Sequence, residues 1–222
     1  VVESLKHCEF NLNTNIEIIW FDTENFKKNK SKLENIDGII VPGGFGSRGI
    51  QGKIDVIQYA RENQIPYLGI CYGLQLAVIE FLRNVCKLPD TTSMEIDDKA
   101  ENPAITLLDE QQNVVELGGT MRLGKYLGKL KSGIVKNLYE KLDLIDENGF
   151  VSERHRHRFE VNPNVISIIE KEGLIVCGNS IERDLVEFIE LEQSKHPYFV
   201  ATQSHPELKS KLEKPAPLFY GL

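Results

Sequence analysis

The stretch from Tyr67 to Phe81, YLGICYGLQLAVIEF, places a predicted strand directly before a predicted helix. It opens with the short apolar run of a buried strand and continues with the apolar spacing of a helix. Cys71 stands at the corner between them, with Gly69 and Gly73 two residues away on either side. This is the G-x-nucleophile-x-G spacing of a nucleophile elbow, in which the glycines leave room for a sharp turn. The spacing therefore predicts a reactive thiol at the carboxyl end of a strand, where open α/β sheets place their sites.

The residues around this corner extend the alternation of strands and helices. Apolar runs predict strands at 16–21, 36–44 and 65–70, and apolar spacing predicts helices at 51–64 and 73–86. Alternation at these intervals is typical of a parallel sheet with helices on both faces. Because the opening residues, VVESLKHC, already look helical, we expect the chain to lack the first strand of its sheet.

After Pro89 the pattern changes to polar loops and paired strands. The stretches 104–117 and 118–130 predict antiparallel strands joined by a turn, and a helix is predicted over 133–143. Later apolar runs predict strands at 174–180, 185–192 and 197–203. We therefore predict one α/β domain over residues 1–222, with a mostly parallel central sheet, helices on both faces and an antiparallel section.

Composition argues against several classes of protein. The net charge of −7 makes broad binding to nucleic acid or to an anionic membrane a poor expectation. No apolar run approaches the roughly 20 residues that span a bilayer. The four cysteines form no CxxC pair, so we expect no metal site and no disulfide scaffold. Cys8, Cys86 and Cys177 are expected in the core, and the compartment is expected to be reducing, intracellular and cytoplasmic.

A base for Cys71 is present in the stretch ATQSHPEL near the end of the chain. In extended backbone, residues two apart point to the same side, so Glu207 can orient the ring of His205. Each motif also has a non-catalytic interpretation. The His-Pro-Glu sequence could form a surface turn, and Cys71 could be a buried structural cysteine at a tight strand–helix joint. The combination favours the catalytic interpretation of both.

An oxyanion hole is indicated by VPGGFGSRG, Val41–Gly49, which follows a predicted strand. Backbone N–H groups of Gly43 and Gly44 can approach a reacting carbonyl because no Cβ intervenes. A phosphate loop is the alternative for such a glycine-rich segment. The segment matches neither the G-x-x-x-x-G-K-[ST] nor the G-x-G-x-x-G pattern, which makes that alternative weak.

With these features in this order, the chain resembles the class I glutamine amidotransferases, and most closely the glutaminase domains of CTP synthases. The resemblance covers essentially the whole chain and is carried by VPGGFGSRG, PYLGICYGLQLAVIEF, GGTMRLGK, ERHRHRFEVNP and SHPE. It implies the flavodoxin-like fold of that family. It also implies hydrolysis of L-glutamine to glutamate and ammonia.

The resemblance assigns roles to individual positions. Cys71 matches the nucleophile, His205 the general base and acid, and Glu207 its orienting partner. Glu95 matches the carboxylate that receives the substrate's α-amino group, although alone it would be taken for a solvated loop charge. The full set matched to substrate binding is Gly44, Tyr72, Gly73, Leu74, Gln75, Glu95 and Arg158.

The RHRHR run, residues 154–158, has two interpretations. It could form a nucleic-acid patch, but its alternation would divide it between the two faces of a strand. We therefore expect Arg154 and Arg156 to be structural or domain-interface residues. Four positions depart from the family pattern, and we expect them to alter the pocket wall or loosen the triad's packing: Tyr72, Leu74, Ser204 and Leu208.

The resemblance also implies parts that lie outside this domain. It implies a preceding synthetase domain that uses ATP and Mg²⁺ to aminate UTP to CTP in pyrimidine biosynthesis, in a homotetrameric enzyme. GTP would activate glutamine hydrolysis, with Arg48 as a candidate contact, and no cofactor is expected in this domain. The alternatives are a catalytically silent regulatory domain, and a cysteine peptidase or γ-glutamyl hydrolase on the same sheet.

Overall fold

The computed structural model describes residues 1–107 and 121–222, and within them a seven-stranded sheet forms the centre of an α/β fold. The strand order is β1-β2-β9-β8-β7-β4-β5. These strands are β1 (Ile39–Val41), β2 (Tyr67–Ile70), β4 (Arg122–Leu130), β5 (Phe150–His157), β7 (Leu174–Ser180), β8 (Val186–Leu191) and β9 (Phe199–Thr202). A separate small sheet pairs β3 (Ile105–Thr106) with β6 (Glu160–Val161).

The sheet has a parallel part and an antiparallel part. β1, β2 and β9 run parallel to one another. From β9 onward, β8, β7, β4 and β5 pair in antiparallel fashion, so this section is longer than the sequence pattern indicated. The predicted α/β class is confirmed. The parallel part carries the elbow and the triad, because the carboxyl ends of β1, β2 and β9 meet at one edge.

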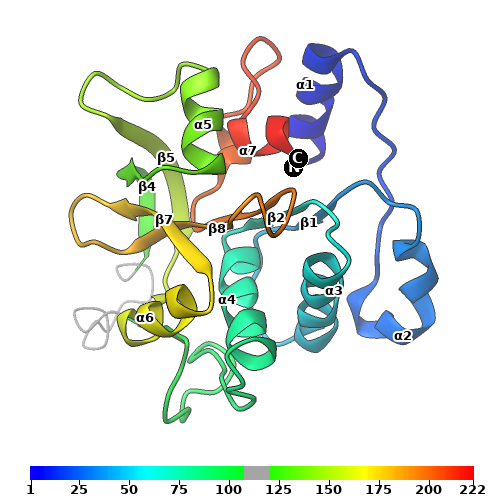
Figure 1. Cartoon of the computed structure of the whole chain (residues 1–222), viewed down its shortest axis with the longest axis vertical. Coiled ribbons are helices and arrows are strands. Elements are labelled where there is room, and N and C mark those ends of the chain that lie inside the picture. The colour runs from blue at the N-terminus through cyan, green and yellow to red at the C-terminus, as the bar shows by residue number, and fades with distance from the viewer. Residues whose placement is uncertain (108–120) are drawn as a thin grey trace.

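Helices cover both faces of the sheet, with α3, α4 and α6 on one face and α1, α5 and α7 on the other (Figure 1). The helices are α1 (Val2–Leu12), α2 (Phe26–Asn29), α3 (Ile50–Glu62), α4 (Tyr72–Asn84), α5 (Ile134–Lys141), α6 (Pro163–Lys171) and α7 (Pro217–Gly221), with short 3₁₀ turns η1 (Thr23–Asn25), η2 (Lys30–Leu33) and η5 (Pro206–Leu208). Successive strand residues point to opposite faces: Tyr67 packs in the core on the α3–α4 side and Leu68 in the core on the other side.

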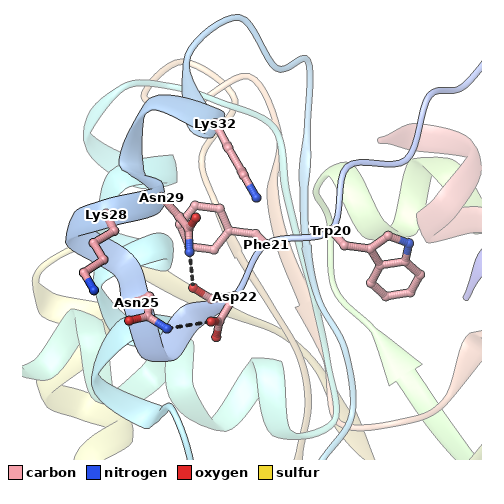
Figure 2. Close-up of a pocket in the computed structure, with 7 residues that line it drawn as sticks. All are labelled: Trp20, Phe21, Asp22, Asn25, Lys28, Asn29 and Lys32. Carbon is pink, nitrogen blue, oxygen red and sulfur yellow. Dashed lines mark hydrogen bonds between the residues drawn. The ribbon is translucent and has the colours of Figure 1, made fainter.

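The predicted buried strand at 16–21 is wrong. The segment has no regular structure, and Ile19 and Trp20 are exposed. Its apolar run has strand propensity, but a strand forms only where a neighbouring strand pairs with it, and this segment pairs with none of the strands described. Trp20 and Phe21 instead line a surface pocket and point to different sides of the chain (Figure 2).

The predicted antiparallel pairing of 104–117 with 118–130 is also wrong for the described residues of the two stretches, 104–107 and 121–130. Residues 108–120 lie outside the described part of the chain. On either side of them, β3 pairs with β6, and β4 pairs with β5 and β7. α6 was not predicted, although its capping signal was present, since the Asn162 side chain accepts the N–H of Asn164 and Pro163 follows the cap.

The remaining expectations about cysteines and helices have clear outcomes. Cys8 and Cys177 are buried as predicted, while Cys86 is only partly buried. All four cysteines are free thiols. None of the helices in the described residues has the length and apolar character needed to cross a membrane.

Candidate active site

Cys71 occupies the corner between β2 and α4, as the spacing predicted. Its backbone has φ 51° and ψ −98°, a conformation that costs a non-glycine residue free energy and that marks functional turns. The Cys71 N–H donates to the carbonyl of Thr202 at 2.7 Å, and its own carbonyl accepts from the Leu74 N–H at 3.1 Å. The thiol is therefore fixed at the N-terminus of α4, where it is the capping residue.

The two flanking glycines are needed for close packing rather than for a positive φ. A Cβ at Gly73 would lie 2.1 Å from the carbonyl oxygen of Val41, in the neighbouring strand. A Cβ at Gly69 would lie 2.7 Å from the Tyr67 hydroxyl and 2.8 Å from the Ala201 Cβ. Glycine at position 73 lets α4 pack closely on β1, and glycine at position 69 lets β9 lie close to the corner.

His205 and Glu207 form the predicted pair after β9, but a 3₁₀ turn, η5, brings them together and not the extended backbone that the sequence suggested. Nδ1 of His205 lies 2.8 Å from Oε1 of Glu207, and the His205 N–H donates to the Arg154 carbonyl in β5 at 2.7 Å. Burial acts to lower the pKa of His205, but its interactions with Cys71 and Glu207 outweigh burial and raise the pKa to about 10. The imidazole therefore holds its proton more tightly than a free histidine side chain does.

The glycine-rich loop after β1 lies against both groups. A Cβ at Gly43 would be 2.7 Å from Cε1 of His205 and 3.6 Å from the Cβ of Cys71. A Cβ at Gly44 would be 3.6 Å from Cδ1 of Tyr72, which is an ordinary contact. The Gly43 backbone thus packs directly on the nucleophile and base, and Gly44 packs on the first residue of α4.

Tyr72 and Glu95 hold this loop in place. The Tyr72 hydroxyl donates to the Gly46 carbonyl at 2.6 Å, and the Gly46 N–H donates to Oε1 of Glu95 at 2.9 Å. Burial, with a smaller effect of the Glu95 charge, raises the pKa of Tyr72, so the hydroxyl stays protonated. The unusual tyrosine therefore does more than alter the pocket wall, because its hydroxyl is a tether for the loop.

Gln203 contacts the nucleophile and was not predicted as a site residue. Its Nε2 lies 3.7 Å from the Cys71 sulfur, and its Oε1 accepts from Nε2 of Gln75 at 3.2 Å. A signal for it was available, because Gln203 directly follows β9 as Cys71 directly follows β2, and the carboxyl ends of parallel strands meet at one edge of a sheet.

A family model described as glutamine amidotransferase class-I matches residues 1–222. The chain belongs to the class I glutamine amidotransferases. Among curated relatives, the CTP synthases of Methanococcus aeolicus and Pyrococcus furiosus are each 48% identical to it and match 100% of its length. The chain spans only 41% and 40% of the length of those two proteins.

Solved structures agree with this assignment. The Trypanosoma brucei CTPS glutaminase domain with bound acivicin is 33% identical, with a TM-score of 0.89 over 99% of this chain and 83% of that one. A Thermoplasma acidophilum protein described as a putative GMP synthase subunit shares the fold, at 16% identity and a TM-score of 0.61 over 99% of this chain and 86% of that one. The expected similarity to glutaminase domains of CTP synthases is confirmed.

The structure separates the residues matched to the amidotransferase's substrate pocket into different environments. Leu74 is fully buried in the core and Gly73 packs on β1, so only their backbone atoms are candidates for substrate contacts. Gln75 is buried, and its Nε2 donates to the Phe159 carbonyl at 3.0 Å. Arg158 is half-buried just after β5. Roles in binding glutamine remain predictions for these four residues.

The RHRHR run of the amidotransferase alternates between two faces of β5, as expected. Arg154 and Arg156 are exposed, whereas His155 and His157 are buried. Nε2 of His155 lies 2.5 Å from Oε2 of Glu187, so the run contributes histidines to the interior and arginines to the surface. No nucleic-acid patch is needed to explain it.

The buried histidines belong to a charged cluster behind the site. Arg122 donates to Glu187 at 2.6 Å and to Glu160 at 3.2 Å, and Nε2 of His157 lies 2.7 Å from the same Glu160 carboxylate. Burial acts to raise the pKa of Glu187, but hydrogen bonds and charges from His155 and Arg122 hold it below its usual value. The cluster therefore contains ionised groups that are paired in the core.

Arg48, the candidate GTP contact, makes a two-pronged pair with Glu24 at 2.9 and 2.7 Å on the surface. Both residues line a hollow of about 340 Å³ that also includes Phe45 and Lys53. A second pocket, of about 610 Å³, lies around Trp20, Asp22, Lys28 and Lys32 (Figure 2). No triad residue lines either pocket, so the catalytic assignment depends on the geometry around Cys71 and not on these hollows.

Proposed function

We propose that this amidotransferase domain hydrolyses L-glutamine to glutamate and ammonia through a thioester on Cys71. One observation carries the proposal: Cys71 sits at a strained helix start, the Gly43 backbone packs on both Cys71 and His205, and Glu207 holds the His205 ring through Nδ1. A nucleophile, an oriented base and backbone donors in contact are the set that acyl transfer requires.

In the first half-reaction, the Cys71 thiolate attacks the side-chain amide carbon of glutamine. The backbone N–H groups of Gly44 and Tyr72 hold the oxyanion that forms. His205 then gives its proton to the departing nitrogen, the C–N bond breaks, and ammonia leaves a γ-glutamyl thioester.

In the second half-reaction, neutral His205 takes a proton from water, and the resulting hydroxide attacks the thioester carbon. The C–S bond breaks and glutamate leaves. Cys71 returns to the thiolate beside a protonated His205, which is the starting state. Glu207 orients the ring throughout and stabilises its cation. Glu95 and Arg158 would hold the substrate's ammonium and carboxylate.

The relatives named CTP synthase are more than twice as long as this chain. This difference in length leaves room for a second domain that uses the ammonia. We propose that the ammonia passes to a synthetase domain of the same polypeptide, which uses ATP and Mg²⁺ to convert UTP to CTP. GTP activation through the surface around Arg48, a homotetramer and a cytoplasmic location are further proposals. The amidotransferase domain alone should hydrolyse glutamine slowly, since such activation depends on the synthetase domain.

The test is glutamate release from L-glutamine, measured with and without a synthetase domain and GTP, together with labelling by acivicin. Cys71→Ala should abolish both turnover and labelling, while the matched control Cys86→Ala should retain them. Glutamine turnover by Cys71→Ala would refute the assignment. An inert wild-type protein with its synthetase partner present would favour a silent regulatory domain, and cleavage of peptides or γ-glutamyl conjugates would favour the hydrolase alternative.

A further inference from the structure

We propose that Gln203 is a further catalytic residue of this site, whose side-chain amide donates a hydrogen bond to the Cys71 sulfur and favours its thiolate form. Because Cys71 is the nucleophile of the proposed function, this inference rests on that function. It goes beyond it by giving the sulfur a second, fixed donor in addition to His205.

The position of Gln203 follows from the register of the sheet. β2 and β9 pair in parallel up to Ile70 and Thr202, so the next residues on the two strands, Cys71 and Gln203, leave the sheet side by side. Gln203 is fully buried, and its backbone N–H donates to the Glu187 carbonyl at 2.9 Å. Its Nε2 lies 3.7 Å from the Cys71 sulfur, a normal distance for an N–H···S hydrogen bond given the size of sulfur.

The orientation of the Gln203 amide is determined by a chain of contacts that starts at a backbone carbonyl. The Phe159 carbonyl can only accept a hydrogen bond, so the Gln75 atom that faces it at 3.0 Å must be Nε2. That same Nε2 also contacts the Gln203 side chain at 3.2 Å, so the Gln203 atom facing it must be the acceptor Oε1. The other end of the Gln203 amide, its NH₂ group, therefore faces the sulfur.

A fixed NH₂ group next to sulfur has a chemical consequence. Hydrogen bonds to an ionised group are stronger than those to the neutral form, so the amide binds a thiolate better than a thiol. A difference of this kind changes the thiolate–thiol ratio by about tenfold or more. The donor costs no reorganisation during the reaction, because Gln203 and Gln75 are both buried and held at their other ends.

The alternative is that Gln203 only fills space in the core. The two possibilities differ in the pH dependence of Cys71 reactivity. A packing residue changes stability, whereas a donor to sulfur changes the pH at which the thiol ionises. Alkylation by iodoacetamide reports this ionisation and needs no glutamine, so the result is independent of whether the protein hydrolyses glutamine.

The experiment measures the rate of Cys71 alkylation by iodoacetamide from pH 5 to 10 in the full chain, with the Cys71 adduct quantified by peptide mass spectrometry. Gln203→Glu keeps the size of the side chain but places a carboxylate beside the sulfur. Gln203→Met keeps the size and removes the donor. We expect the midpoint of the pH–rate profile to rise by at least about one unit in both variants, which corresponds to a tenfold loss of thiolate.

A variant remote from the sulfur makes the test sharper. In Gln75→Glu, both terminal oxygens are acceptors, so the Gln203 amide should turn its NH₂ group toward residue 75 and its oxygen toward Cys71. The midpoint should rise in this variant too, and Gln203→Met, which adds no charge, separates loss of the donor from the effect of a new carboxylate. The control Gln193→Glu makes the same change of charge in the exposed turn after β8 and should leave the midpoint unchanged.

Circular dichroism and urea unfolding establish which variants are folded before their profiles are compared. The proposal is overturned if the folded variants at positions 203 and 75 keep the wild-type midpoint, because Gln203 would then be a packing residue. If Gln203→Glu does not fold, the alkylation midpoints of Gln75→Glu and Gln203→Met are compared with the wild-type midpoint by the same criterion. A wild-type protein that alkylates normally but fails to hydrolyse glutamine even with its synthetase domain and GTP present would refute the proposed function and leave this measurement valid.

Discussion

Replacing Gly43 with alanine should damage catalysis without unfolding the protein. The added methyl carbon would start 2.7 Å from Cε1 of His205, whereas ordinary carbon contacts are about 3.5 Å, so the ring must move by roughly 0.8 Å. The backbone at Gly43 does not have a positive φ, so alanine introduces no backbone strain there. Since a misplacement of about 1 Å costs roughly 100-fold in rate, kcat should fall about 100-fold, or about 2.7 kcal/mol in activation free energy.

The assay is steady-state glutamate release by the wild type and Gly43→Ala, with urea unfolding of both. The matched control is Gly128→Ala in β4, where the added methyl would meet no atom closer than 3.5 Å and should leave kcat unchanged. We expect the unfolding free energy of Gly43→Ala to stay close to wild type, because the methyl meets a side chain that can move. A folded Gly43→Ala variant with kcat within a few-fold of wild type would refute the placement of this loop against the triad.

Two further predictions concern charged groups. Against the opposing effect of burial, His205's triad partners raise its pKa from 6.5 to about 10, so its pairing stabilises the fold fully below pH 6.5 and is lost as the pH rises through 10. The advantage of wild type over His205→Gln in urea unfolding should therefore shrink between pH 6.5 and 10, and a constant advantage would contradict the shift. Arg122→Met should cost about 3–5 kcal/mol of unfolding free energy, because Glu160 and Glu187 would stay buried without their cation. Arg48→Met, which removes an exposed pair, should leave the urea midpoint near wild type, and equal losses in the two variants would argue against a buried cluster.

Much of the site could be predicted from the sequence because its parts are local patterns. The elbow at Cys71 is a five-residue spacing, and the His205–Glu207 contact joins residues only two apart in sequence, although a 3₁₀ turn and not extended backbone brings them together. The strands and helices around Cys71 have clear apolar periodicity, so their existence was predictable from short windows.

The remaining features depend on contacts between distant parts of the chain. Residues 16–21 have the composition of a strand but no partner to pair with, and a single sequence does not show which edges are available. The partners of β4 are β5 and β7, which are separated from it by helices and loops in the sequence. The role of Gln203 likewise depends on β9 lying beside β2, because only that register brings its amide to the sulfur.

The position of β9 determines the order in which the site assembles during synthesis and folding. β9 is the last of the described strands along the chain, yet it lies between β2 and β8 inside the sheet. During synthesis, β2 and the cysteine after it therefore leave the ribosome more than a hundred residues before the strand that delivers their base. Such a non-local parallel pairing closes late in folding. Until β9 pairs with β2, Cys71 of the nascent chain lacks His205 and Glu207 beside it. The catalytic site therefore assembles late in folding.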